Sequence, residues 1–443
     1  MWAYPLIAWG TSLPHVRDIF FDEFYAELER VAASIARDEE DVETPPALRE
    51  EARRRWRPYV PDPEDRGGVL ISVDGGVQVS NFAYGGFVAA GRACAVVCWP
   101  GRDRAIEKRV KIYVEEVYDE RDRGFIPGYV RMISEYDVAR AAAERVLGEG
   151  AQPLVLLDGS LYFSRFPYAI REYQHHPELL AELFTSIAAL HRLGMERGFP
   201  VVAVSKDSTV FYLYMALLKE AATRAGLGRL TEQIERATSP LDLRLKMVKW
   251  PPEDREAMRP LLEERPLCDT ALIRASAKEE GYTQPLMLAP SIYFGRDDAP
   301  ALYRRIKENL DAETANRVIR ALQDFFSHPG VAVTYWKPTR KARPFRVDIS
   351  AAALGYTEPW GRREGNMFVE WDRDLSRLEA VLNHLGYWFC NEVEYNVPLM
   401  QADMIARFDR TLYRTKYEPF IISRLKRAGL DITGRRRTLR KGG

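Results

Sequence analysis

Residues 153–163, PLVLLDGSLYF, contain a short apolar run that ends in an aspartate. The run at 154–157 is bounded by a proline and a glycine, which is typical of a fully buried strand. Because a carboxylate at the end of such a strand is costly to desolvate, Asp158 needs a charged partner, and a metal ion is one candidate. The alternative is that Asp158 opens a turn, since Asp-Gly is a common turn dipeptide.

Two further stretches repeat this pattern, which favours a site over an isolated turn. The apolar run 69–73 is followed by Asp74 and two glycines, and the run 201–204 is followed by Ser205 and Lys206. In sheets of the α/β class, sites are built at the C-terminal ends of strands. The repetition therefore predicts that these polar side chains meet at one edge of a sheet.

The order of the elements predicts an α/β fold. Apolar alternation over 69–118 indicates a β-meander, 130–148 has the pattern of a helix, and another helix separates the strands at 154–157 and 201–204. Residues 331–349 return to strand character. We therefore expect a mixed sheet with helices on both sides.

The charges of the chain balance, which excludes a strong field from the protein as a whole. There are 64 Lys plus Arg and 64 Asp plus Glu, so binding to nucleic acid would need a local basic surface. Arginine-rich stretches at 53–57, 337–346 and 434–441 could supply one. The alternative is that these stretches are solvated faces or a frayed tail.

The cysteines and the hydropathy argue against a zinc site and a membrane span. The four cysteines are scattered and lack the spacing of metal ligands. Their low number and the absence of a signal peptide predict a cytoplasmic protein. No apolar run is long enough to cross a membrane. Glycine-rich phosphate loops are also absent, so we do not expect this chain to hydrolyse ATP by itself.

A glutamate falls on the apolar side of the predicted helix at 130–148. Glu135 shares that side with Ile133, Ala139, Ala142, Ala143 and Val146. Since buried charges are usually paired or bind metals, Glu135 is a candidate ligand. The alternative is that it lies near the helix start and interacts only with the helix dipole.

Asp74, Glu135 and Asp158 together predict a site for hard divalent cations. Carboxylate oxygens suit Mg²⁺ or Mn²⁺. Two such ions about 4 Å apart can activate a water and stabilise the leaving oxygen in phosphodiester cleavage. Lys206 could neutralise charge on the phosphate or orient the water, and its plain alternative is a structural pair with Asp207.

These motifs resemble those of the NurA family, nucleases of archaea and some bacteria with an RNase H-like core. The matching segments are VDGG at 73–76, LLDGSL at 156–161, VSKDS at 204–208, FRVDIS at 345–350 and YNVPLMQADMIARF at 395–408. FRVDIS resembles the Arg-x-acidic motif of the family. The last segment resembles a motif in which a tyrosine is followed eight residues later by a histidine.

The resemblance implies an activity, a cofactor and partners. It implies a nuclease of DNA ends with single-strand endonuclease and 5′-to-3′ exonuclease activity that depends on Mn²⁺ (or Mg²⁺), with two ions. It also implies a homodimer that docks on a hexameric HerA-type ATPase in DNA end resection and recombinational repair. Asp74, Glu135 and Asp158 match the metal-binding acids, and Tyr395 matches the motif tyrosine. Glu115, Glu116 and Glu144 are alternatives to Glu135 because they also lie between the two Asp-Gly motifs.

One position departs from the family pattern, because Asp403 stands where the family has histidine. An aspartate can bind a hard cation, but it cannot act as a neutral proton shuttle near pH 7. We expect Asp403 to be a metal ligand, and the catalytic residues to be Asp74, Glu135, Asp158, Lys206, Tyr395 and Asp403. The substitution keeps a second hypothesis open, a non-catalytic or weakly active adaptor of the translocase. A defence nuclease acting on invading DNA or on RNA is a third.

These features divide the chain into three parts. We expect an N-terminal helical arm over 1–62 that contacts a partner or a second subunit, and a NurA-like nuclease domain over 63–425. That domain would carry a mostly helical insertion at about 209–325, and a basic tail would span 426–443. The basic stretches are expected to face the DNA path, the first of them through Lys337, Arg340, Lys341, Arg343 and Arg346.

Overall fold

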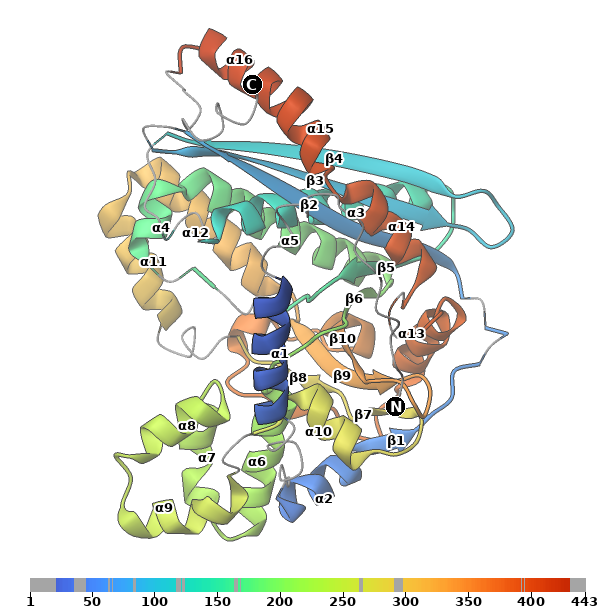
Figure 1. The fold of residues 1–443 in the computed structure, drawn as a ribbon, viewed down its shortest axis with the longest axis vertical. Coiled ribbons are helices and arrows are strands. Elements are labelled where there is room, and N and C mark those ends of the chain that lie inside the picture. Colours follow the sequence, from blue (N-terminus) through green and yellow to red (C-terminus); the bar gives the residue numbers. More distant parts are fainter. Residues whose placement is uncertain are drawn as a thin grey trace.

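An 11-stranded mixed sheet with helices on both faces forms the centre of the protein (Figure 1). The structure is a computed structural model that describes residues 21–35, 45–62, 64–65, 67–82, 85–116, 121, 124–162, 166–167, 169–262, 266–290, 298–391, 393 and 395–430. Within these residues the strands are β1 Trp56–Pro58, β2 Val69–Asn81, β3 Phe87–Cys98, β4 Ala105–Glu115, β5 Pro153–Asp158, β6 Val201–Ser205, β7 Gly281–Thr283, β8 Leu286–Met287, β9 Val331–Lys337, β10 Phe345–Ser350 and β11 Met367–Phe368.

The strand order is β1-β7-β9-β10-β6-β5-β2-β3-β4, with β8 pairing β9 and β11. Strands β2, β5 and β6 are parallel to one another, whereas β3, β4 and β10 join them by antiparallel pairing. This arrangement confirms the expected α/β fold, a mixed sheet flanked by helices. The parallel strands lie in the middle, where helices cover both faces, and this explains their nearly continuous apolar sequences.

Two hydrophobic cores lie on opposite faces of the sheet. Helices α3, α5 and α12 pack on one face and α13 and α14 on the other. The described helices are α1 Phe21–Ile35, α2 Pro46–Arg54, α3 Ile126–Gly148, α4 Ile170–His175, α5 Pro177–Arg197, α6 Tyr212–Arg224, α7 Thr231–Glu235, α8 Pro240–Met247, α9 Pro252–Met258, α10 Asp269–Ser276, α11 Asp298–Asn309, α12 Ala312–Ser327, α13 Ser376–Tyr387, α14 Val397–Ala406, α15 Arg410–Leu412 and α16 Glu418–Arg427.

Helix α3 confirms the helix predicted at 130–148, although it begins earlier, at Ile126. A proline in the first turn is compatible with this start, because its missing N–H would have no partner inside the helix. The residues predicted to form its apolar side are all buried against the sheet and α5. Three of these residues are alanines, and such small side chains let the helix backbone approach the strands closely.

Strand β2 is longer than the sequence predicted. The glycines after Asp74 suggested that the strand ends there, but it continues to Asn81 because β3 pairs with it along its whole length. The parallel pairing with β5 does end nearby, at Val73 opposite Leu157. Asp74 therefore lies inside a strand, at the fork where β2 separates from β5.

A lobe of helices lies to one side of the sheet, at the lower left of Figure 1. Helices α6 to α10 and α2 share a core there with one side of β9. The helical insertion predicted for about 209–325 is interrupted, because β7 and β8 join the main sheet and α12 packs on α5 in the main core.

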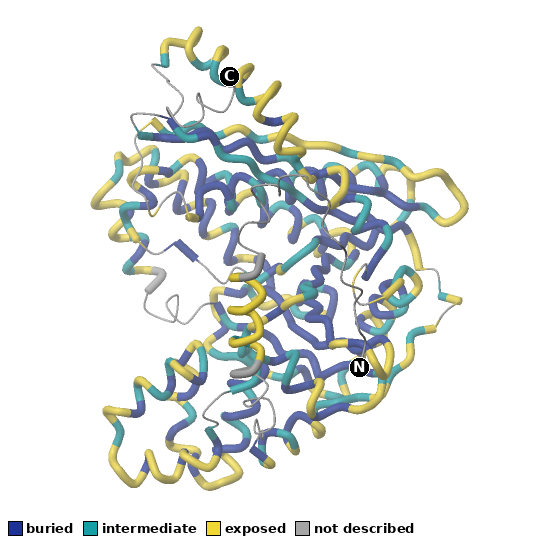
Figure 2. Tube along the Cα trace, viewed as in Figure 1, coloured by how far each residue is buried: buried dark blue, intermediate teal, exposed yellow. Residues whose placement is uncertain are grey.

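The N-terminal segment predicted as an arm divides into two parts. Helix α2 packs in the lobe and β1 pairs with β7 at the edge of the sheet, so residues 46–58 belong to the folded body. Residues 23–30 and 32 of helix α1 are exposed (Figure 2), and Phe24, Tyr25 and Leu28 are among them.

The C-terminal helices end the described part of the chain. Ile421 of α16 packs with Tyr413 on the far end of β2 and β3. Most of the predicted basic tail, including the stretch 434–441, lies outside the described residues. No helix in the described part of the chain has the length and apolarity needed to cross a membrane.

Candidate active site

The two glycines after Asp74 let other elements approach the fork between β2 and β5. A Cβ atom on Gly75 would lie 2.5 Å from Glu135 Oε1, and one on Gly76 would lie 2.7 Å from the carbonyl oxygen of Ala406. Neighbouring strand residues face opposite sides of a sheet, so α3 approaches at Gly75 and the end of α14 at Gly76. Glycine is needed at both positions because a Cβ atom would collide with the element that packs against that face of β2.

Asp74 and Asp158 point to the face of the sheet that α14 covers. Leu70 on β2 and Leu156 on β5 lie in the core on that face, and the two aspartates follow them at even spacing. Asp158 closes β5, as the sequence predicted. Strand geometry thus brings the carboxylates of two parallel strands to one place.

The carboxyl group of Asp74 has a pKa raised to about 7. Burial is the main cause, because it disfavours the charged form. The negative charges of Asp158, Glu135 and Asp403 raise the pKa further, while a hydrogen bond from the Gly75 amide, at 2.6 Å, opposes the shift. The four acids predicted from the sequence are therefore close enough to interact.

Glu135 is buried at this fork, as its place on the apolar side of α3 predicted. Burial raises the pKa of its carboxyl group, the cation of Arg131 lowers it, and the charge of Asp158 raises it. Arg131 Nε lies 3.5 Å from Glu135 Oε1. That oxygen accepts no hydrogen bond from any residue that the structure describes.

Lys206 and Tyr395 complete the group of residues predicted from the sequence. Lys206 Nζ lies 3.5 Å from Asp158 Oδ2, so the cation is placed beside the cluster. Tyr395 is fully buried, and its hydroxyl has no hydrogen-bond partner among the described residues. Burial, followed by the charge of Asp158, raises the pKa of this phenol well above its usual value. Its backbone has a φ of 39°, a left-handed conformation that is uncommon for a residue with a side chain.

The donor set fits a hard divalent cation. Among the described residues no three His, Cys, Asp or Glu side chains are placed so that together they could hold a metal ion. The carboxylate oxygens are nevertheless of the type that Mn²⁺ and Mg²⁺ prefer. A cation would also relieve the repulsion that raises the pKa of Asp74, and would coordinate Glu135 Oε1, which accepts no hydrogen bond from the described residues.

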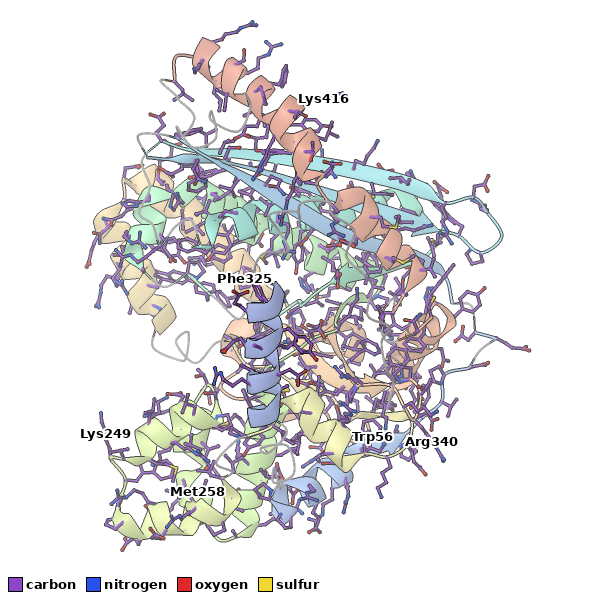
Figure 3. All side chains as sticks on the ribbon, viewed as in Figure 1. Trp56, Lys249, Met258, Phe325, Arg340 and Lys416 are labelled. Atoms are coloured by element: carbon purple, nitrogen blue, oxygen red, sulfur yellow. The ribbon has the colours of Figure 1, made fainter. Side chains whose placement is uncertain are left out.

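Two of the five cations predicted to bind DNA are buried, which corrects that prediction. Lys337 is buried and donates to the carbonyl oxygens of Ala277 and Lys278, at 3.1 and 3.2 Å, just after the end of α10. Arg346 is buried in an ion pair with a neighbour on its own strand. Neither side chain presents charge at the surface. The remaining three, Arg340 (labelled in Figure 3), Lys341 and Arg343, are exposed.

Sequence reasoning missed the role of Ser160 and Asp348. Arg346 Nε donates to Asp348 Oδ1 at 2.7 Å, and Ser160 Oγ donates to Asp348 Oδ2 at 2.7 Å. The signal was available in FRVDIS, because residues two apart on a strand lie on the same face and can pair. The contact with Ser160, which lies 188 residues away in sequence, could not be predicted.

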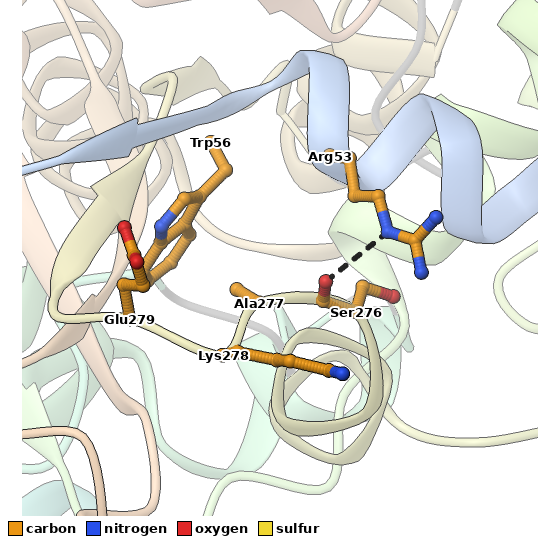
Figure 4. Close-up of a pocket in the computed structure, with 6 residues that line it drawn as sticks. All are labelled: Arg53, Trp56, Ser276, Ala277, Lys278 and Glu279. Carbon is orange, nitrogen blue, oxygen red and sulfur yellow. Dashed lines mark hydrogen bonds between the residues drawn. The ribbon is translucent and has the colours of Figure 1, made fainter.

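A cavity of about 350 Å³ lies away from the acids. Arg53, Trp56 and the segment 276–279 line it, and Arg53 Nε donates to the carbonyl oxygen of Ser276 (Figure 4). These residues come from α2, β1 and the connection between α10 and β7. None of the residues predicted for the site lines this cavity.

Comparison with known proteins supports the resemblance seen in the motifs. The family model of the NurA domain matches residues 68–362, which is more than half of the chain. No curated protein matches the sequence. The crystal structure of the NurA nuclease from Sulfolobus solfataricus aligns with a TM-score of 0.47 and 13% identity, over 92% of this chain and 98% of that one. A crystal structure of NurA with manganese aligns with a TM-score of 0.40 and 13% identity, over 88% and 96% of the two chains. From the extent of the family match, we conclude that the chain belongs to the NurA family.

Proposed function

We propose that this protein is a metal-dependent nuclease that hydrolyses phosphodiester bonds in DNA. The observation that carries the proposal is the meeting of Asp74, Glu135 and Asp158 at the fork between β2 and β5. Buried acids that raise one another's pKa are costly to the fold and are typical of functional sites. Membership of the NurA family supports the same function.

Each residue of the cluster has a distinct part in this mechanism. Asp74, Glu135 and Asp158 would hold Mn²⁺ or Mg²⁺, with Asp403 beside them. Such ions, when bound, lower the pKa of a water and stabilise the leaving oxygen of a phosphodiester. Lys206 lies beside Asp158, where its ammonium group can pair with a phosphate oxygen.

Proton transfer is the step in which this chain differs from its family. The raised pKa of Tyr395 keeps its hydroxyl protonated, so the group can donate a hydrogen bond at the cluster. Asp403 is exposed on α14, where the family has histidine. An aspartate can help to hold a cation, but it has no imidazole ring and cannot serve as a neutral proton shuttle.

We extend the proposal to the partners of the protein and to the direction in which it degrades a DNA strand. The protein would act as a homodimer with a HerA-type hexameric ATPase, cutting single strands internally and degrading DNA ends from 5′ to 3′ in end resection and recombinational repair. Family membership supports this extension. Helix α1, with Phe24, Tyr25 and Leu28 exposed, offers an apolar surface that a partner could cover.

A second function has one observation in its favour. The aspartate at position 403 removes the family histidine, which favours an adaptor that binds the translocase but cuts weakly. The retention of Asp74 and Asp158 opposes this function, because a protein without catalysis has no need of two costly acids at one fork.

Cleavage of labelled single- and double-stranded DNA with Mn²⁺ or Mg²⁺, with and without the HerA-type ATPase, tests the proposal. We expect metal-dependent cutting that Asp158→Ala and Asp74→Ala each reduce by at least about 100-fold, because the loss of a ligand disrupts the bound ion. Circular dichroism and the melting temperature should show that both variants remain folded. A folded wild-type protein that binds the ATPase but never cuts would support the adaptor instead.

A further inference from the structure

The hydroxyl of Ser160 joins the turn after Asp158 to a buried ion pair. Ser160 Oγ donates to Asp348 Oδ2 at 2.7 Å and accepts from Arg346 Nη2 at 3.0 Å. Ser160 itself is exposed, whereas the side chains of Arg346 and Asp348 are 4% and 1% exposed. An exposed serine at the end of β5 is therefore anchored in the interior of the protein.

The backbone after Ser160 wraps around the same carboxylate. The amides of Leu161 and Tyr162 donate to Asp348 Oδ2 at 3.0 and 3.3 Å, and the Tyr162 amide also donates to Ser160 Oγ at 3.0 Å. One oxygen of Asp348 thus fixes three successive residues. Hydrogen bonds to a charged acceptor are stronger than neutral ones, so this turn is held firmly.

The other end of the turn is fixed by the sheet. The Gly159 amide donates to the carbonyl oxygen of Val204 at 2.9 Å, which continues the pairing of β5 with β6. Gly159 has a φ of 107°, a conformation that strongly favours glycine, and there the chain turns away from the strand. Asp158 lies immediately before this turn, so its backbone direction depends on the anchor that follows.

The ion pair that provides this anchor is buried and lies on a strand that is paired on both sides. Arg346 and Asp348 lie on β10, which is paired on both sides by β6 and β9. Arg346 Nε and Nη2 donate to the two oxygens of Asp348 at 2.7 and 2.9 Å. The guanidinium also lies 5.0 Å from the centre of the Tyr212 ring. Separating the two side chains would leave an uncompensated charge in the interior, which is strongly destabilising. The pair is therefore expected to keep its geometry.

We propose that Ser160, Arg346 and Asp348 are positioning residues that set the orientation of the Asp158 carboxylate for metal binding. This inference rests on the proposed function, because it assigns Asp158 as a ligand. The three residues need not touch the metal or the DNA. They act through the turn 159–162, much as hydrogen-bonded partners behind metal ligands orient those ligands in other proteins.

Ser160→Ala is the sharpest test, because the residue is exposed and its removal leaves the buried ion pair intact. We expect Mn²⁺ binding, measured from the electron paramagnetic resonance signal of the free ion, to weaken by about 10-fold. We expect kcat at saturating DNA and fixed Mn²⁺ to fall as well, with little change in KM. Ser160→Thr retains the hydroxyl and should restore both quantities.

Ser239→Ala is the matched control. Ser239 Oγ accepts a hydrogen bond from the Asp242 amide at the start of α8, so this variant loses a serine hydrogen bond far from the acids, in the helical lobe, whereas Ser160→Ala loses at least three. It should bind Mn²⁺ like the wild type, because its hydroxyl lies away from the turn after Asp158. Unchanged Mn²⁺ affinity and kcat in Ser160→Ala would overturn the inference, and so would global unfolding of that variant, which would assign the hydroxyl to stability. A wild-type protein that neither binds Mn²⁺ nor cuts would instead contradict the proposed function.

Discussion

The imidazole rings of His191 and His328 stack with their centroids 4.4 Å apart and their planes 8° apart. Both residues are buried between α5 and the end of α12, and the Nε2 atom of each has no hydrogen-bond partner in the described structure. Burial lowers the pKa of His191 to about 4. Burial and the neighbouring ring lower the pKa of His328 well below its usual value. The native state therefore holds this pair uncharged.

This pair predicts a loss of stability in acid. Between about pH 6.5 and pH 4 the unfolded chain binds protons at these positions and the native state does not, so the free energy of unfolding falls as the pH falls. For His191 alone the loss is about 3 kcal/mol at pH 4. His191→Phe should flatten the pH dependence, measured by urea unfolding. A His191→Phe variant whose free energy of unfolding falls as steeply in acid as that of the wild type would contradict this prediction.

Replacement of Gly75 should impair the site more than the fold. The Cβ atom of Gly75→Ala would meet the end of the Glu135 side chain, which can rotate away but then leaves the place where its charge acts on Asp74. We expect cleavage to fall by about 100-fold, because a shift of about 1 Å at a reacting group has effects of this size. The melting temperature should change little. Gly128→Ala, on the open side of α3, should retain activity, since nothing lies within 4 Å of its Cβ position. Equal activity in the two variants would contradict this role of Gly75.

The exposed part of the basic stretch should contribute to DNA binding through charge. Lys341→Gln combined with Arg343→Gln should reduce the slope of log affinity against log salt by about 0.7 for each lost phosphate contact on single strands. Arg340 should contribute less, because Glu279 and Glu280 lie 3.7 Å from its guanidinium. Fluorescence anisotropy over a range of salt concentrations measures the slope. An unchanged slope in the double variant would exclude this stretch from the DNA path.

Asp403→His should change the pH dependence of cleavage. The variant regains a side chain that titrates near neutral pH, so kcat should acquire a transition near the usual histidine pKa of about 6.5. The loss of one negative charge should also weaken Mn²⁺ binding slightly, because Asp403 lies near Asp74. Identical pH profiles in the variant and the wild type would show that position 403 takes no part in proton transfer.

The sequence was informative where a pattern extends over several residues. The apolar runs predicted β2, β5 and β6, and the stripe of small residues on α3 predicted that Glu135 would be buried. Strand alternation and strand ends then placed Asp74 and Asp158 together. These conclusions depend on local periodicity, which a single sequence records directly.

The errors come from interactions between distant segments. The Gly-Gly pair suggests the end of a strand, but glycine inside a strand can also mark the close approach of another element, here the Glu135 side chain of α3 and the backbone at the end of α14. The sequence predicts a basic surface that includes Lys337 and Arg346. In the structure Lys337 donates hydrogen bonds to carbonyl groups at the end of α10, and Arg346 pairs with Asp348. The short strands β7 and β8 lack a periodic pattern and exist because β9 offers them an edge.

The position of Asp74 inside β2 has a consequence for how this protein meets its substrate. A carboxylate on a loop can follow a moving ligand, but this one is carried by a strand whose amides are engaged on both sides of the fork. Hydrogen exchange of the Asp74 amide should therefore be slow, even though the side chain of this residue belongs to the proposed active site. If the proposed function holds, the DNA would have to be bent, melted or threaded until its phosphate reaches a stationary acid. Selectivity for flexible or single-stranded DNA would then follow from the stiffness of one strand, without any contact to a base.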